Sequence, residues 1–157
     1  EGVGSTFIIK IPFKIASTPY KVNKQTSEIK IDGLNLLLVE DNELNVEIAE
    51  TLLSDEGAVV TVAKDGLQAV NIFKEKPEGS FDAILMDIMM PVMDGLTATK
   101  KIRTLNHPDA KKIPIIAMTA NAFKEDKEKC LTAGMNAHLA KPIEIENVKK
   151  VLCEQIR

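Results

Sequence analysis

The stretch FDAILMDIMMPVMDG, residues 81–95, decides the fold of this 157-residue chain. It opens with an apolar run that predicts a buried strand ending at Asp87. Pro91 and the pair Asp94-Gly95 follow, and these residue types predict a loop and a turn. Apolar residues at helical spacing resume directly after the turn. The stretch therefore predicts a strand, a loop and a helix in succession.

The same unit recurs on both sides of this stretch. Apolar runs predict further strands over residues 34–39, 59–62, 113–118 and 137–140, and the segments between them have helical periodicity. Strands that alternate with helices form a parallel sheet covered on both faces. We therefore predict one α/β domain over residues 34–157, with five parallel strands in a doubly wound sheet.

The first 33 residues differ in kind from the rest of the chain. Residues 7–13, FIIKIPF, predict a single strand, and Pro12 suits an edge position in a sheet. Residues 16–33 lack periodicity and have the Ser, Thr, Lys, Asn and Gln composition of a linker. We therefore divide the chain into a segment over 1–15, a linker over 16–33 and the domain. The chain starts at Glu1 without a methionine, which suggests a piece of a longer protein.

Composition excludes several classes of function. The net charge is −3 and no Lys/Arg-rich block is present, which argues against nucleic acid as a partner. No apolar run approaches the roughly 20 residues that cross a bilayer, so we expect no membrane contact and a cytoplasmic location. A membrane anchor elsewhere in the parent protein stays open. Cys130 and Cys153 lack metal-type spacing, so we expect reduced, structural thiols.

Polar residues follow the predicted strands at the point where each strand ends. Glu40 and Asp41 follow the first strand, Asp87 ends the third, Thr119 follows the fourth and Lys141 the fifth. Ligands of parallel α/β sheets bind beyond the carboxyl ends of the strands. We therefore expect these five side chains to converge on one crevice.

This set of residues predicts phosphoryl transfer that depends on a metal. Three clustered carboxylates repel one another by about 4 kcal/mol per pair at 4 Å, so they indicate a cation. Mg²⁺ prefers oxygen, and we expect Asp41 and Asp87 as direct ligands, with Glu40 acting through water. Asp87 is the candidate nucleophile toward phosphorus. Thr119 offers a hydroxyl donor and Lys141 a positive charge to the phosphoryl group, and the same site should hydrolyse the acyl phosphate.

The motifs resemble those of response regulator receiver domains, over about four-fifths of the chain: VEDN at 39–42, LMDIMMPVMDG at 85–95, MTAN at 118–121 and AKP at 140–142. The resemblance implies a flavodoxin-like fold with strand order 2-1-3-4-5. It also implies that Met89 gives a backbone carbonyl to the metal, for which Mn²⁺ is a substitute. Met89 and Asn121 are further implied to set the lifetime of the phosphorylated state.

One position departs from the family pattern. The family usually has Tyr or Phe three residues before the lysine, and this chain has His138 there. We predict that His138 changes its rotamer together with Thr119 when the domain is phosphorylated. The alternative is a partly exposed strand histidine with no role in switching.

The start of the chain has a resemblance of its own. GVGSTF followed by IIKIPF, residues 2–13, is similar to the last glycine box and final strand of the histidine kinase ATP-binding domain. The two resemblances together imply a hybrid histidine kinase, of which residues 1–15 are the end of the catalytic domain. The implied partners are a phosphohistidine donor domain in the kinase and a downstream histidine phosphotransfer protein. A homodimer is left open.

Three other interpretations compete with this one. Glu40 and Asp41 could simply cap the following helix, since acidic residues favour a helix N-terminus. A second is an aspartyl phosphatase of the haloacid dehalogenase type, but its D-x-D-x-T signature is absent after the first strand. The third, a phosphorylation-independent protein-binding receiver, would lack the phosphoacceptor, the lysine or the acidic pair, and none is lacking here.

Overall fold

The structure, a computed structural model, describes residues 8, 10, 30–120 and 124–156, and within them forms one five-stranded parallel sheet. The sheet order is β2-β1-β3-β4-β5. This confirms the predicted flavodoxin-like, doubly wound fold with order 2-1-3-4-5. The strands are β1 (Asn35–Val39), β2 (Val59–Ala63), β3 (Ala83–Asp87), β4 (Ile115–Thr119) and β5 (Ala137–Ala140), and the helices are α1 (Glu43–Asp55), α2 (Gly66–Glu75), α3 (Gly95–Thr104), α4 (Lys124–Ala133) and α5 (Ile145–Gln155).

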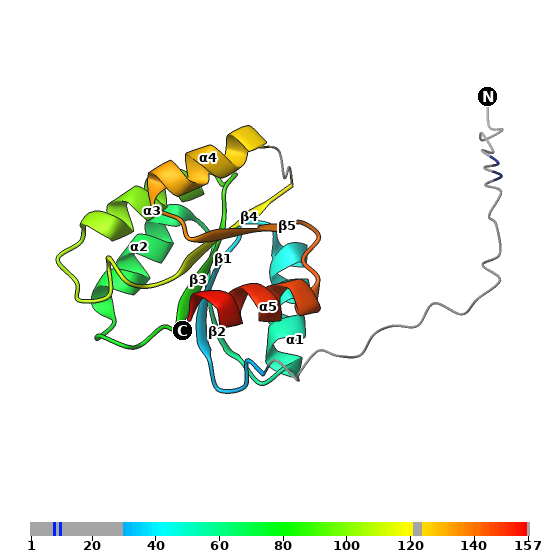
Figure 1. The fold of residues 1–157 in the computed structure, drawn as a ribbon, viewed down its shortest axis with the longest axis horizontal. Helices are drawn as coiled ribbons and strands as arrows, with labels where there is room; N and C mark the ends of the chain where they lie inside the picture. The colour runs from blue at the N-terminus through cyan, green and yellow to red at the C-terminus, as the bar shows by residue number, and fades with distance from the viewer. Residues whose placement is uncertain (1–7, 9, 11–29, 121–123, 157) are drawn as a thin grey trace, which may run out of the picture.

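Helices cover both faces of the sheet. Helices α1 and α5 lie on one face, and α2, α3 and α4 lie on the other (Figure 1). All strands are parallel, and β2 pairs with one edge of β1 while β3 pairs with the other edge. The helices that connect these strands therefore lie on opposite faces of the sheet. The order therefore reverses beside β1, and this reversal opens a crevice at the carboxyl ends of the central strands.

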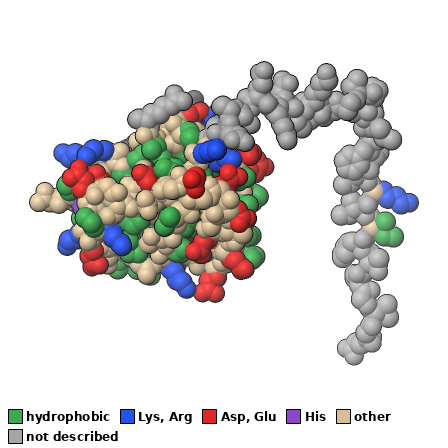
Figure 2. All heavy atoms as spheres, turned by 90° about the horizontal axis from the view of Figure 1, so that it is seen from below, with side chains coloured by type: hydrophobic (Ala, Val, Ile, Leu, Met, Phe, Trp, Pro, Cys, Tyr) green, Lys and Arg blue, Asp and Glu red, His purple; other side chains and the backbone are tan. Residues whose placement is uncertain are grey.

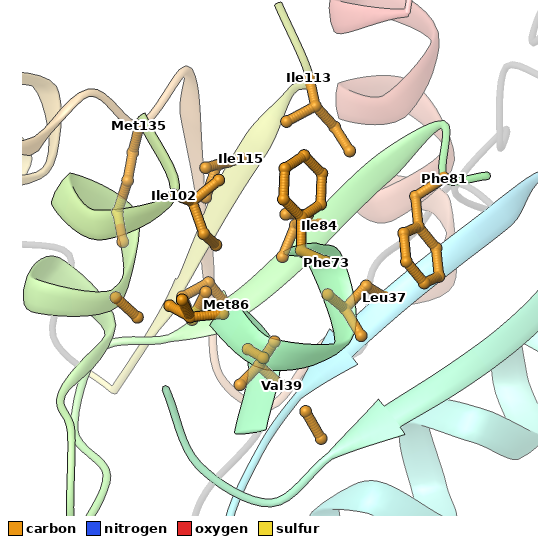
Figure 3. Packing of buried hydrophobic residues seen from close by; sticks show 14 of the residues in the cluster. Leu37, Val39, Phe73, Phe81, Ile84, Met86, Ile102, Ile113, Ile115 and Met135 are labelled. Atoms are coloured by element: carbon orange, nitrogen blue, oxygen red, sulfur yellow. The ribbon is translucent and has the colours of Figure 1, made fainter. Parts of the chain in front are cut away.

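Alternation along the strands sends side chains into two separate cores. On β3, Ile84 and Met86 point toward α2 and α3, whereas Ala83 and Leu85 point toward α1 and α5. In the first core, Phe73 of α2 and Ile102 of α3 lie over the strands (Figure 3). Every residue of β3 is buried, including the polar Asp87 at its end. The apolar core thus holds the backbone of Asp87 rigidly in the sheet.

The packed domain includes Ile31, which lies in the predicted linker. Ile31 is fully buried in the core under α1 and α5, beside Leu36 and Leu53. The backbone N–H of Gly33 donates to the carbonyl of Gly57 at 2.9 Å and fixes this segment against the turn after α1. The chain therefore packs as part of the domain three residues before the predicted start at Leu34. The strand predicted over 7–13 lies outside the described residues, apart from Ile8 and Lys10.

The described surface carries charges of both signs. Acidic and basic side chains are interspersed on the face shown in Figure 2. Cys130 is buried and Cys153 is half-buried, and neither of them forms a disulfide. In the described part of the chain, no helix combines the length and apolarity that a membrane crossing needs.

Candidate functional site

The register of the sheet brings the predicted site residues to one edge. Between β1 and β3, Val39 pairs with Met86. Between β3 and β4, Asp87 pairs with Met118. At the last pair of strands, Thr119 lies opposite Ala140. Asp87 and Thr119 are among these paired residues, and Glu40 and Lys141 directly follow Val39 and Ala140, so the four meet at the carboxyl edge.

Lys141 lies at the centre of the site, between two buried carboxylates. Its Nζ donates to Oε2 of Glu40 at 2.5 Å and to Oδ2 of Asp87 at 2.7 Å. The side chains of Glu40 and Asp87 are 3% and 7% exposed, so water screens these ion pairs little. The backbone N–H of Lys141 donates to the carbonyl of Thr119 at 2.8 Å, which locks the ends of β4 and β5 together.

The two charged partners respond differently to burial. Burial raises the pKa of Asp87 and outweighs the opposing ion pair with Lys141 and the backbone hydrogen bond from Met89. Burial alone would lower the pKa of Lys141, but its bonds to Asp87 and Glu40 outweigh that effect and raise it. One ammonium group therefore neutralises two buried carboxylates only in part.

A third carboxylate completes an acidic cluster. One oxygen each from Glu40, Asp41 and Asp87 lies within 4.8 Å of the others. Asp41 is exposed, so an ion can enter from solvent. Three carboxylate oxygens suit a hard divalent cation such as Mg²⁺, and the surplus of negative charge favours one. The structure thus brings together the residues predicted as metal ligands, and their individual roles remain predictions.

The acidic pair does not cap helix α1. Asn42 is the N-cap, and its Oδ1 accepts from the backbone N–H groups of Leu44 and Asn45. The capping interpretation of Glu40 and Asp41 is therefore wrong, because a residue beside them already satisfies those donors. The carboxylates of Glu40 and Asp41 are therefore available to bind a ligand in the crevice.

The loop after β3 is tightly bound to the backbone of Asp87. The N–H of Gly95 donates to the carbonyl of Ile88 at 3.0 Å, and a Cβ added to Gly95 would lie only 2.0 Å from the carbonyl oxygen of Asp87. Within the loop, Val92 has a φ of 65°, and the N–H of Met93 donates to the carbonyl of Pro91 at 2.6 Å, which forms a γ-turn. The pair at 94–95, predicted as a plain turn, therefore also positions the candidate nucleophile.

Met89 lies beside the acidic cluster. Its backbone N–H donates to Oδ1 of Asp87 at 3.2 Å, and its side chain is 80% exposed. The side chain is thus free to contact a ligand or a partner above the site. Asn121, the other residue implied to set the phosphorylated lifetime, lies outside the described residues.

Thr119 and His138 lie toward the same face of the sheet. Thr119 is half-buried, and alternation along β4 places it on the side of Ala117, which packs in the α2–α4 core. His138 pairs with Ala117 and alternates with Leu139, which packs in the α1–α5 core. Burial, with a smaller effect of Lys127, lowers the pKa of His138, which favours the neutral form of its ring.

The structure adds Asn45 to the residues expected from the sequence. Its Nδ2 donates to Oε1 of Glu40 at 2.9 Å. The sequence contains a signal for this residue. Asn45 follows the capping Asn42 by one turn, so it lies on the side of α1 that faces the strand ends. Helical position alone does not separate such a residue from an ordinary surface asparagine.

Comparison with known proteins identifies the family. The response regulator receiver domain family matches residues 36–153. Hybrid signal transduction histidine kinase I of Dictyostelium discoideum is 43% identical over 123 residues, which are 77% of this chain and 7% of that protein. The aerobic respiration control sensor protein ArcB of Escherichia coli (strain K12) is 37% identical over 145 residues, 92% of this chain and 18% of ArcB. The chain thus spans less than a fifth of the length of these relatives.

Solved structures of receiver domains resemble this chain in sequence and in fold. The receiver domain of sensor histidine kinase PA1611 from Pseudomonas aeruginosa PAO1, with a magnesium ion in its active site cleft, has 44% identity and a TM-score of 0.71, and the match covers 79% of this chain and 98% of that one. The Saccharomyces cerevisiae complex of the phosphotransfer protein Ypd1 with the receiver domain of Ssk1 matches with 33% identity, a TM-score of 0.68, and coverage of 79% and 89%. The predicted resemblance is confirmed: this chain belongs to the response regulator receiver domain family and is homologous to the receiver domains of hybrid histidine kinases.

Proposed function

We propose that this domain is the receiver of a hybrid histidine kinase and accepts a phosphoryl group from a phosphohistidine onto Asp87. The observation that carries the proposal is Lys141, held between Glu40 and Asp87 beside the exposed Asp41. A buried ion pair next to a surplus of carboxylates supplies a nucleophile, a phosphate-binding cation and a metal site in one place.

The residues of the chain divide the work of transfer. The carboxylate of Asp87 attacks phosphorus, so that a new oxygen–phosphorus bond forms while the bond to the donor imidazole breaks. Lys141 then exchanges its bond to Asp87 for one to the phosphoryl oxygens, and Thr119 donates its hydroxyl to another of them. Mg²⁺ bound by Asp41, Asp87 and the carbonyl of Met89, with Mn²⁺ as a substitute, would supply the positive charge that offsets the transferring group.

The same residues explain a conformational response. Phosphorylation adds about −1.5 to −2 charges at neutral pH. We propose that Thr119 moves toward this charge and that His138, on the same side of the sheet, follows it. The exposed side chain of Met89 and that of Asn121 are proposed to control access of water to the acyl phosphate, and so its lifetime.

The surface around the site supports a histidine phosphotransfer protein as the partner. Four large apolar side chains are exposed there: Leu44 and Ile48 on α1, and Met89 and Val92 in the loop after β3. Exposed apolar groups gathered around a reactive residue mark a contact surface. A second copy of this chain is the alternative occupant, and it would appear as a concentration-dependent dimer in sedimentation.

The parent protein is proposed to be a histidine protein kinase, with residues 1–15 as the end of its catalytic domain and 16–33 as the linker, of which Ile31 packs against the receiver. The ArcB match, which covers 92% of the chain, reaches beyond the receiver and supports this division. Neither Cys130 nor Cys153 forms a disulfide, which is consistent with the reducing cytoplasm, where we place this domain.

Mass spectrometry of the chain after incubation with acetyl phosphate and Mg²⁺ tests the function. We expect one added phosphoryl group on the wild type and none on Asp87→Asn. Thr119→Ala should still take up phosphate but show smaller chemical-shift changes in β4 and β5. Phosphate retained on Asp87→Asn would remove Asp87 from its central role.

A further inference from the structure

We infer that Asn45 is a positioning residue of the phosphoacceptor site, which holds the carboxylate of Glu40 in the orientation that fixes Lys141 against Asp87. The inference rests on the proposed function, because it concerns the same site. It adds to that site a residue from the exposed surface of α1. The hydrogen bond from Asn45 to Glu40 carries it.

Glu40 is anchored at both of its carboxylate oxygens. Oε2 accepts from Nζ of Lys141 at 2.5 Å, and Oε1 accepts from Nδ2 of Asn45 at 2.9 Å. The backbone N–H of Asn42 also approaches Oε1, but at 3.4 Å it is near the limit of a hydrogen bond. Asn45 therefore provides the stronger of the two contacts that stop this carboxylate from rotating.

The orientation of Glu40 affects the candidate nucleophile Asp87 through Lys141. Lys141 divides its Nζ between Glu40 and Asp87, at 2.5 and 2.7 Å. If Glu40 rotates, Lys141 loses one of its two fixed partners, and its position over Asp87 is no longer defined. The orientation of the Asn45 amide is itself required chemically, because an ionised Glu40 only accepts hydrogen bonds and so must face the NH₂ group.

Asn45 is placed to act on the site without supporting the core. Its side chain is exposed on α1, and it lines a cavity of about 60 Å³ together with Glu40, Lys141 and Pro142. Replacing an exposed side chain leaves no void inside the domain, so Asn45→Ala should fold normally. Its effect can therefore be measured on the site.

The chain contains a matched control for this bond. Asn147 is an exposed residue of α5, and its Nδ2 donates to Oε2 of Glu144, also at 2.9 Å. Glu144 is exposed and is not a member of the acidic cluster. If such bonds matter only for helix stability, Asn45→Ala and Asn147→Ala should behave alike.

Carboxyl-carbon NMR of the whole chain reports on the bond directly. Without metal, Asn45→Ala should shift the Glu40 carboxyl resonance, whereas Asn147→Ala should leave it unchanged. In a Mg²⁺ titration followed by the Asp87 resonance, we expect Asn45→Ala to weaken binding by about threefold to tenfold, the usual net effect of losing one hydrogen bond. The rate of phosphorylation by acetyl phosphate should fall by a similar factor.

A double-mutant cycle shows whether Asn45 acts through Glu40. In a Glu40→Ala background, the further change Asn45→Ala should alter neither Mg²⁺ affinity nor rate. An undiminished effect there would overturn the inference, as would an Asn45→Ala protein with a wild-type Glu40 resonance, Mg²⁺ affinity and rate. If the proposed function itself were wrong, the wild type would bind no Mg²⁺ and accept no phosphate, which is a distinguishable result.

Discussion

Gly95→Ala should both destabilise the domain and slow phosphorylation. The added Cβ would lie 2.0 Å from the carbonyl oxygen of Asp87 and 3.0 Å from its carbonyl carbon, both of them backbone atoms. The backbones of Gly95 and Asp87 must separate by about 1 Å to relieve this clash, and a misplacement of that size can cost about 10²-fold in rate. Overpacking of this kind costs about 1–3 kcal/mol, against a gain of at most about 1 kcal/mol from Ala in a helix.

Urea unfolding followed by far-ultraviolet circular dichroism suits this test, since the chain has no Trp. We expect a loss of about 2 kcal/mol, equivalent to roughly 5–10 °C in Tm. Gly79→Ala is the control: Gly79 has a φ of 74° and nothing within 4 Å of an added Cβ, so this change should cost about 1 kcal/mol of backbone strain and leave phosphorylation unchanged. A Gly95→Ala protein with wild-type stability and rate would refute the steric argument.

Two further predictions concern strain and charge in the site. Val92→Gly should stabilise the domain by about 1 kcal/mol in thermal unfolding, because Val92 is a β-branched residue at a φ of 65° with 81% of its surface exposed; an unchanged Tm would mean that the γ-turn is unstrained. Burial raises the pKa of Asp87, so the stability that its protonation contributes is present at low pH and is lost as pH rises through the folded pKa. Asp87→Asn should therefore raise Tm at pH 7 without metal, and the gain should shrink on acidification; a gain that is the same at every pH would contradict the burial argument.

The sequence predicts the fold because the central strands β1, β3 and β4 are apolar runs with a polar residue at or just after their ends. Ile115 and Ile116, for example, are both fully buried, on opposite faces of the sheet, as an uninterrupted run requires. The convergence of Glu40, Asp87 and Lys141 follows from parallel topology alone, since all three lie at carboxyl ends.

Contacts that depend on side-chain rotamers or on exact loop geometry could not be predicted in this way. The bond from Asn45 to Glu40 depends on the rotation of α1 about its axis, which periodicity fixes only approximately. The close approach of Gly95 to Asp87 depends on the γ-turn at Val92, and valine is a residue type that does not suggest a positive φ. The burial of Ile31 could not be predicted either, because a single apolar residue carries no periodic signal.

The burial of Ile31 determines where the chain enters the domain. Residues 31–33 join at the amino end of β1, whereas Asp87 and Lys141 lie at the opposite pole, about 16 Å away along a five-residue strand. The chain therefore enters the domain at the end of the sheet that is remote from the chemistry, and the crevice that holds Asp87 and Lys141 lies clear of this point of entry.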